Sequence, residues 1–243
     1  MKEHIDWEEI YNTDFIFSND CWKTCNSNCC RNSFEAYYKL LPKKSMQLFF
    51  FPDEYEYYQS IGGVKDITSR PKKRIFTMPS GDKIELISLS CECQGKCSPH
   101  SSRPLVCRLY PYFPIINDNN DIEGFEFGSV IEIFYENPEL NHPCTLVRQN
   151  SKEIQDILKD KMKLLLKYPS IVYFFKAYHI LANALRDAQA CKFDNLKDEK
   201  DFIEFFKQYE WNVFTGNPFK NPVVVKELID EYIKMNDKAI KLL

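Results

Sequence analysis

Cysteine placement constrains this chain more than any other feature of its sequence. Most of the ten cysteines fall into two dense groups separated by a long intervening segment. The first group is Cys21, Cys25, Cys29 and Cys30; the second is Cys91, Cys93, Cys97 and Cys107, with Cys144 following it. Thiols this dense usually share a metal ion or an iron–sulfur cluster, or they are joined in disulfides. The fold is therefore expected to bring loops together around sulfur atoms.

Charge and hydropathy point to a cytoplasmic protein. The 32 basic and 35 acidic residues give a net charge of −3, which argues against a nucleic-acid-binding surface. Residues 1–15 contain no continuous apolar run of the kind found in a secretory signal. The apolar stretch at 171–185 is interrupted by Lys176 and is too short to span a membrane. In a reducing cytoplasm, clustered cysteines are more often metal ligands than disulfides, and a disulfide-bonded protein is the alternative.

The sequence of the first part of the chain indicates short strands and irregular loops. Pro52, with acidic residues directly after it, predicts a helix over 52–60 that ends at the Gly62–Gly63 pair. The turn sequence at 79–82 predicts a hairpin between two β-prone runs. The other expected elements are a helix at 33–41, a strand at 47–51, a basic solvated loop at 65–74, hairpin strands at 75–78 and 83–89, a turn at 117–121 and a strand pair within 125–135.

The last third of the chain has helical periodicity. Amphipathic patterns predict helices over 152–168, 169–190, 198–211 and 222–242. We therefore predict an α+β protein: a cysteine-rich metal-binding module with short strands and irregular loops over 1–149, and a helical C-terminal extension over 150–243. The helical extension is a candidate surface for a protein substrate or partner.

The cysteine spacings exclude two common metal motifs and favour loops. The chain contains no Cys-x2-Cys pair, so it has neither a zinc ribbon nor the radical S-adenosylmethionine motif. On an ideal helix Cys21 and Cys29 would lie about 12 Å apart along the axis. Because a Zn–S bond is about 2.3 Å long, one zinc ion could not bind both. In the second group, Gly95 allows a tight turn that would bring two thiols together.

The sequence around these cysteines resembles the zinc- or iron-chelating cysteine-cluster family (the CxxCxxCC domain), which includes the flagellin lysine N-methylases. Four segments over about 18–147 carry the resemblance. They are the spaced cysteines ending in the Cys29-Cys30 pair, the run Leu48-Phe-Phe-Phe-Pro-Asp-Glu54, the Cys91 to Cys97 segment, and Arg-Pro-Leu-Val-Cys-Arg-Leu-Tyr-Pro from Arg103 to Pro111. A later cysteine-containing loop corresponds to Cys144. The first gaps here are three residues rather than two, and either Cys91 or Cys93 could be the family ligand.

The resemblance implies a bound metal, as an iron–sulfur cluster or zinc, with nine ligands: the eight cysteines of the two groups and Cys144. For the methylase members it further implies methyl transfer from S-adenosylmethionine to protein lysines. Three hypotheses follow: a metal-binding protein with a structural or redox-sensing centre, a lysine N-methylase-like enzyme, and a module that passes metal to a partner.

Several residues beside the cysteines have both a functional and a structural interpretation. The guanidinium groups of Arg103 and Arg108 could donate to metal-bound sulfur or could form structural contacts. His100 and His142 could act as ligands but are more often structural. Glu54 could support the metal site, although capping of a helix is the commoner role for a glutamate at this position.

Overall fold

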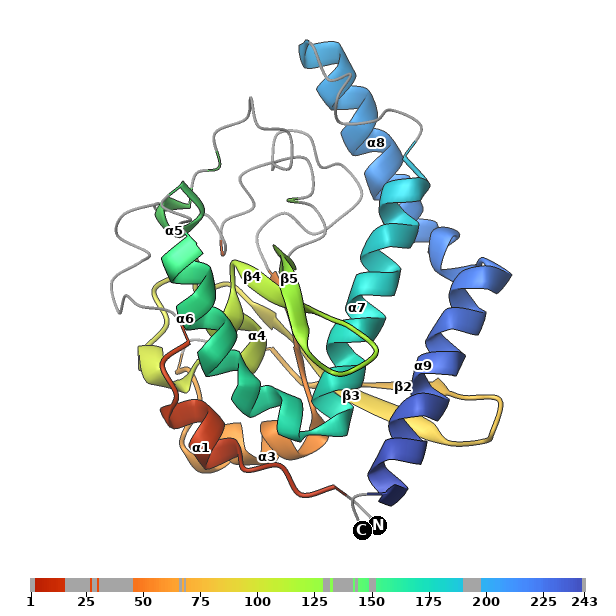
Figure 1. Ribbon diagram of the computed structural model, residues 1–243. Helices are drawn as coiled ribbons and strands as arrows, with labels where there is room; N and C mark the ends of the chain where they lie inside the picture. The colour runs from red at the N-terminus through yellow and green to blue at the C-terminus, as the bar shows by residue number, and fades with distance from the viewer. Residues whose placement is uncertain are drawn as a thin grey trace. The chain divides into compact units, whose positions relative to one another are not determined.

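The computed structural model describes residues 3–15, 27, 30, 46–65, 67, 69–128, 132, 142, 144–148, 152–189 and 198–241. The chain divides into two compact units, each described separately below. The first unit comprises residues 1–32, 44–113 and 143–168, and the second comprises 33–43, 114–142 and 169–243. The helices and strands are labelled in Figure 1.

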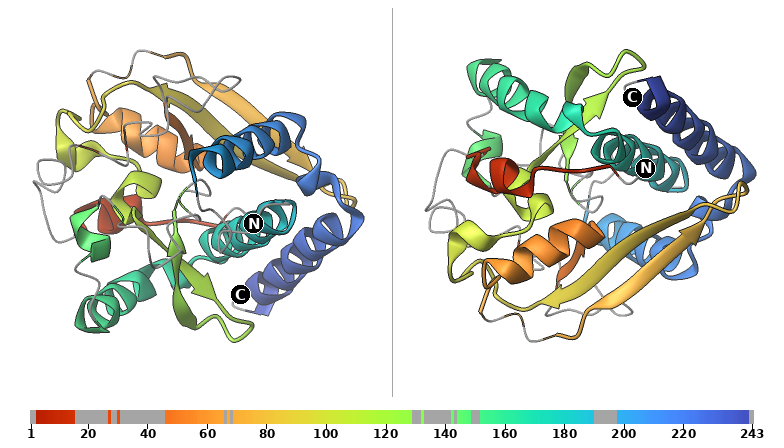
Figure 2. Two further views of the ribbon diagram at one scale, coloured as in Figure 1. Left: turned by 90° about the horizontal axis from the view of Figure 1, so that it is seen from above. Right: turned by 90° about the horizontal axis from the view of Figure 1, so that it is seen from below.

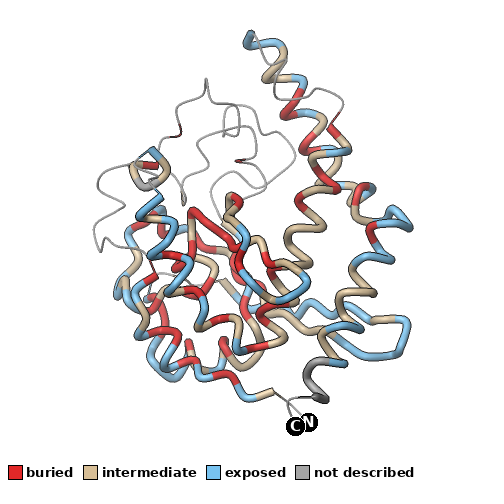
Figure 3. Tube along the Cα trace, in the orientation of Figure 1, coloured by how far each residue is buried: buried red, intermediate tan, exposed pale blue. Residues whose placement is uncertain are grey.

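A three-stranded antiparallel sheet forms the centre of the first unit. Its strands are β1 (Met46–Phe50), β2 (Lys72–Thr77) and β3 (Lys83–Cys91), in the order β1-β3-β2. β1 pairs with the second half of β3 and β2 with its first half, so the β2–β3 hairpin extends beyond β1. One face of the sheet packs into the core through Leu48, Phe50, Leu89 and Cys91. The core is drawn in red in Figure 3.

Two short helices accompany this sheet. α1 (Trp7–Asn12) begins at Asp6, whose carboxylate accepts a hydrogen bond from the Glu9 N–H at 2.8 Å. α3 (Pro52–Ser60) begins with proline, which needs no hydrogen-bond acceptor in the first turn. Both glycines that follow α3 have positive φ, a conformation that stops the helix.

The second half of the first unit is helical. It contains η1 (His100–Ser102), α4 (Leu105–Leu109), α5 (Thr145–Arg148), α6 (Lys152–Met162) and η3 (Lys163–Lys167). α4 is only five residues long, and Leu105 and Leu109 are almost completely buried in it. A helix of this length gains little from its own hydrogen bonds, so its packing and its anchoring to other segments must hold it in place.

The second unit combines a hairpin with three long helices. The hairpin consists of β4 (Tyr112–Ile116) and β5 (Ile122–Phe127), and the boundary between the units falls within β4. The helices are α7 (Pro169–Asp187), α8 (Glu199–Thr215) and α9 (Pro222–Lys241), with η5 (Pro218–Lys220) before α9. Gly216 has a φ of 64° and ends α8 in the left-handed conformation.

α7 and α9 lie side by side, as Figures 1 and 2 show. The rings of Tyr173 and Tyr232 pack edge to face, with centroids 5.6 Å apart. The Lys176 ammonium, largely buried, lies 3.0 Å from the Glu231 carboxylate. This helix pair therefore combines aromatic packing with a shielded ion pair.

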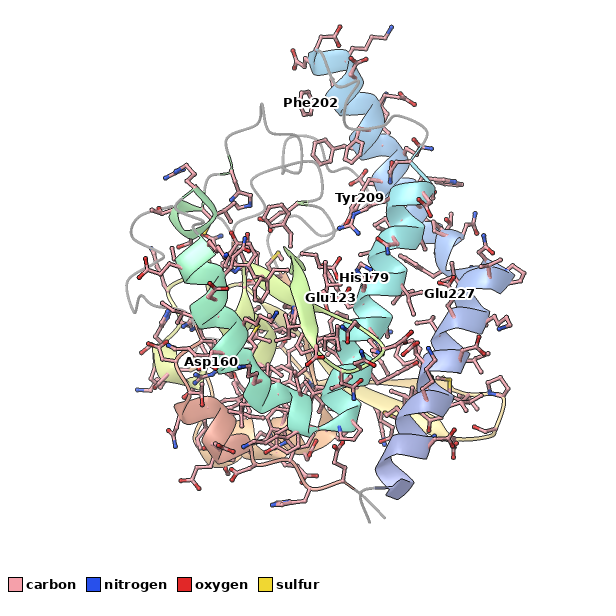
Figure 4. All side chains as sticks on the ribbon, viewed as in Figure 1. Glu123, Asp160, His179, Phe202, Tyr209 and Glu227 are labelled. Carbon is pink, nitrogen blue, oxygen red and sulfur yellow. The ribbon has the colours of Figure 1, made fainter. Side chains whose placement is uncertain are left out.

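A closed ring of polar side chains joins β5 to α7. The buried carboxylate of Glu126 accepts from His179 Nδ1 at 3.0 Å and from Arg186 at 3.4 Å. Asn183 completes the ring, because its side chain bonds to His179 Nε2 at 3.1 Å and accepts from Arg186 at 2.6 Å. His179 is labelled in Figure 4. Each member has a partner, as a buried polar group requires.

The structure confirms the mixed α+β class and the C-terminal helical region. Helix 52–60 and the hairpin around 79–82 form as predicted, and the strand expected at 47–51 is β1. The expected helix at 33–41 lies outside the described residues, and the boundary between 149 and 150 stays a prediction. None of the helices within the described ranges is long and apolar enough to cross a membrane.

One sequence prediction of local structure was wrong. Lys72 to Arg74 belong to β2 rather than to a loop, because they pair with Leu86 to Ser88 on β3. In β2, cross-strand pairing extends the strand beyond the residues with high β propensity. A hairpin of β4 with β5 lies on either side of the predicted turn at 117–121. Most of 129–135 lies outside the described residues, so the strand pair expected within 125–135 stays a prediction.

We predict that Glu126→Ala destabilises the second unit by about 2 kcal/mol, because His179 and Arg186 lose their shared buried acceptor. Amide hydrogen exchange along α7 measures this loss. Glu123→Ala is the matched control, since Glu123 is exposed on the same strand (Figure 4). Equal exchange in the two variants would contradict a stabilising role for the ring.

Candidate metal centre

Cysteines of the second group lie in the core of the first unit. β3 ends at Cys91, which packs with Cys93 among Leu48, Phe50 and other buried apolar residues. Cys97 and Cys107 are partly exposed and pack against this same core. β3 thus places Cys91 in a core against which Cys97 and Cys107, from two later segments, also pack.

A tight turn returns the chain from Cys93 to Cys97. The Lys96 N–H donates to the Cys93 carbonyl at 2.9 Å, and the two residues between them, Gln94 and Gly95, have φ values of 48° and 83°. Positive φ at both central positions is the pattern of a type I′ turn. The prediction that Gly95 permits a tight turn here is therefore confirmed.

The same glycine packs against the segment that carries Cys30. A Cβ atom on Gly95 would lie 2.1 Å from the Ser27 Oγ, so no other residue fits without movement. Ser27 is buried and opens a turn in which the Cys30 N–H donates to the Ser27 carbonyl at 2.9 Å. The turn that carries Cys30 therefore packs directly on the turn that precedes Cys97.

The buried carboxylate of Glu54 fixes the segment that carries Cys107. Its Oε1 accepts from the Leu105 N–H at 2.7 Å and from the Tyr11 hydroxyl at 3.0 Å. Its Oε2 accepts from the Phe51 N–H at 3.3 Å, which caps α3. Glu54 therefore has both of the roles considered from the sequence: it caps a helix and supports a cysteine-bearing segment.

Electrostatic interactions link four of the thiols. Burial raises the pKa of the Cys107 thiol well above its ordinary value. The next three causes of that rise are the thiols of Cys30, Cys91 and Cys97. Burial, Cys30 and Cys91 likewise raise the pKa of Cys97 to about 11. Four sulfur atoms from three segments therefore share one largely buried region in which their negative charges would repel each other.

The structure gives Cys91 and Cys93 different surroundings. Burial raises the pKa of Cys91, whereas hydrogen bonds from the backbone and side chain of Cys93 lower it. Cys93 thus donates toward the Cys91 sulfur, and the charge of Cys91 is among the causes that raise the pKa values of both Cys97 and Cys107.

The two arginines of the Arg103–Pro111 motif have different roles. The charge of Arg103 lowers the pKa values of Cys97 and Cys107, which places its guanidinium near these thiols. Arg108 instead donates to the carbonyls of Ser101 and Arg103 and lies over the ring of Tyr11, 4.5 Å from its centroid. The structural interpretation therefore holds for Arg108.

Of the remaining candidates, the structure describes Cys144 and His142. Cys144 is buried, and its charge is felt by Tyr112. His142 lies in the second unit, 3.4 Å from Glu132 and stacked on Phe127. The predicted ligands Cys21, Cys25 and Cys29 lie outside the described residues.

The residues present suit a soft metal. Four neighbouring thiols are the donor set of a structural zinc site or an iron–sulfur cluster. Within the described ranges, no group of three or more Cys, His, Asp or Glu side chains is arranged to hold a metal ion. The thiols are thus brought near one another, and the ligand set itself stays a prediction.

Comparisons with protein-family models, curated proteins and solved structures found no match to this chain. The resemblance to the cysteine-cluster family therefore depends on the sequence motifs alone and stays a prediction.

We predict that Glu54 makes the stability of the first unit depend on pH. Burial raises its pKa from 4.5 to about 7. Because the folded state holds the proton more tightly than the unfolded state, stability is full below the unfolded pKa and falls as pH rises toward 7. The corresponding free energy is roughly 3 kcal/mol. Urea unfolding of Glu54→Gln should lack this fall.

Glu56→Gln is the matched control, since Glu56 is exposed on the same helix. It should keep the fall in stability with rising pH. If Glu54→Gln and the unmodified chain lose stability in parallel between pH values of about 4 and 8, Glu54 is not the titrating group.

We predict that Gly95→Ala separates the turn that carries Cys30 from the turn that precedes Cys97. Gly95 and Gly62 have the same φ of 83°, but only Gly95 has atoms within 4 Å of the added methyl group. Gly62→Ala should therefore cost only the strain of a left-handed alanine, roughly 1 kcal/mol. Gly95→Ala should cost more and should speed alkylation of Cys30, followed by mass spectrometry. Equal alkylation in the two variants would contradict the contact with Ser27.

Proposed function

We propose that this chain binds a metal centre, an iron–sulfur cluster or zinc, through clustered cysteine thiolates. The proposed ligands are Cys30, Cys91, Cys97 and Cys107. The observation that carries the proposal is the convergence of these four thiols from the turn at Ser27, the end of β3 with the turn after it, and α4.

Burial of these thiols favours metal binding over ionisation without a metal. The pKa values of Cys91, Cys97 and Cys107 are raised, so at neutral pH these three thiols keep their protons when no metal is bound. A metal cation replaces those protons and removes the repulsion between neighbouring thiolates. The positive charge of Arg103 offsets part of the negative charge that four thiolates would leave.

The environment also suggests how the site would be supported. Hydrogen bonds from Cys93 to the Cys91 sulfur are the type of contact that tunes a bound centre. Glu54 and Gly95 are not ligands, but they position two of the three ligand-bearing segments. A site built this way suits a structural or redox-sensing centre. Methyl transfer from S-adenosylmethionine stays a prediction of the family resemblance.

The first experiment is anaerobic purification with metal analysis and an absorption spectrum on the same sample. A broad band near 400 nm with several irons per chain would establish an iron–sulfur cluster. A colourless protein with bound zinc would establish a structural site. A metal-free protein with disulfides would contradict the proposal.

Variants at Cys91 and Cys93 test the assignment of ligands. We predict that Cys91→Ser loses most of the bound metal, because it removes a ligand, whereas Cys93→Ser retains it. These two cysteines are matched, since both are buried in the same core. Metal loss from Cys93→Ser alone would reverse the assignment. Circular dichroism of both variants separates metal loss from unfolding.

A further inference from the structure

The strand β2 has an open edge. It pairs with β3 on one side and is the last strand in the order β1-β3-β2. All six of its residues are exposed, as the pale blue hairpin in Figure 3 shows. In an antiparallel pair, alternate residues direct their N–H and C=O groups away from the partner strand. β2 therefore presents main-chain donors and acceptors to which another strand can bind.

Apolar side chains flank this edge on both faces of the hairpin. Ile75 is 50% exposed and Phe76 is 55% exposed, and they point to opposite faces because they are adjacent in a strand. Phe76 is opposite Ile84 on β3. An extended chain beside β2 would place its own alternating side chains against these residues on both faces.

The edge is strongly basic in a chain that is acidic overall. Residues 70–85 contain five basic and two acidic residues, so this segment carries a charge of +3 against −3 for the whole chain. Lys73 is neutralised by Glu85 at 2.7 Å. Lys72 and Arg74, on the face that carries Phe76, form no ion pair with any residue in the described ranges. Their charges are available to a partner.

We propose that the outer edge of β2 binds an extended acidic segment of a partner protein as an additional strand. Main-chain hydrogen bonds along Lys72–Thr77 hold the segment in register. Acidic side chains on the face of Lys72 and Arg74 supply charge complementarity, and Ile75 and Phe76 supply apolar contacts. This inference does not depend on the proposed metal site.

Charge distinguishes this partner from the alternatives. A second copy of the chain would bring its own basic β2 to the edge, and the like charges would repel it. A nucleic acid would satisfy the basic side chains but not the row of main-chain donors and acceptors. The combination of an open edge and positive charge therefore favours an acidic polypeptide.

The test uses the full-length protein and a fluorescent peptide of alternating glutamate and valine residues, followed by anisotropy. Three comparison probes are the same peptide with N-methyl groups on alternate amides, a peptide with lysine in place of glutamate, and a single-stranded oligothymidine. The N-methyl groups block strand pairing without changing charge. The expected result is binding of the first peptide alone, weakened by salt.

The variant Lys72→Glu/Arg74→Glu should weaken this binding by about tenfold or more. Lys152→Glu is the control, since Lys152 is exposed on α6, away from the hairpin in sequence. Circular dichroism establishes that both variants fold. The proposal is overturned if no peptide binds, if the N-methylated peptide binds equally well, if oligothymidine binds in preference, or if the double variant binds like the control.

Discussion

The buried carboxylate of Glu54 is the point at which three segments of the first unit meet. It accepts hydrogen bonds from Tyr11 on α1, from the residue before α3, and from Leu105 at the start of α4. A carboxylate removed from water is costly unless donors surround it, so these contacts must form together. The short helix α4, and with it Cys107, keeps its place because this polar centre is complete.

Local structure was predictable where a few neighbouring residues determine it. Pro52 and the acids after it were sufficient for α3, and the Gly81 turn was sufficient for the β2–β3 hairpin. The start of β2 at Lys72 was not predictable, because basic residues join the strand only through pairing with β3. The anchoring of α4 depends on a side chain more than fifty residues earlier, and no local pattern reveals that contact.

In the candidate site, too, features of short segments were predictable and contacts between distant segments were not. Cysteine spacing identified both groups and the turn at Gly95, since these are properties of short segments. It could not distinguish Cys91 from Cys93, because the hydrogen bonds from Cys93 to the Cys91 sulfur are a property of the folded chain. Nor could spacing identify Ser27 as the residue against which Gly95 packs, because that contact joins segments far apart in the sequence.

The antiparallel pairing of β1 with β3 also fixes the face of the sheet on which the thiol at the end of β3 lies. Met46 pairs with Cys91, and the side chains along β3 alternate between the core and the opposite face. A slip of one residue would exchange Leu89 and Cys91 for Ser90 in the core. The alternation of side chains along β3 therefore decides whether the Cys91 thiol faces the core. An insertion of an odd number of residues within that pairing would turn the thiol away from the core without changing any cysteine.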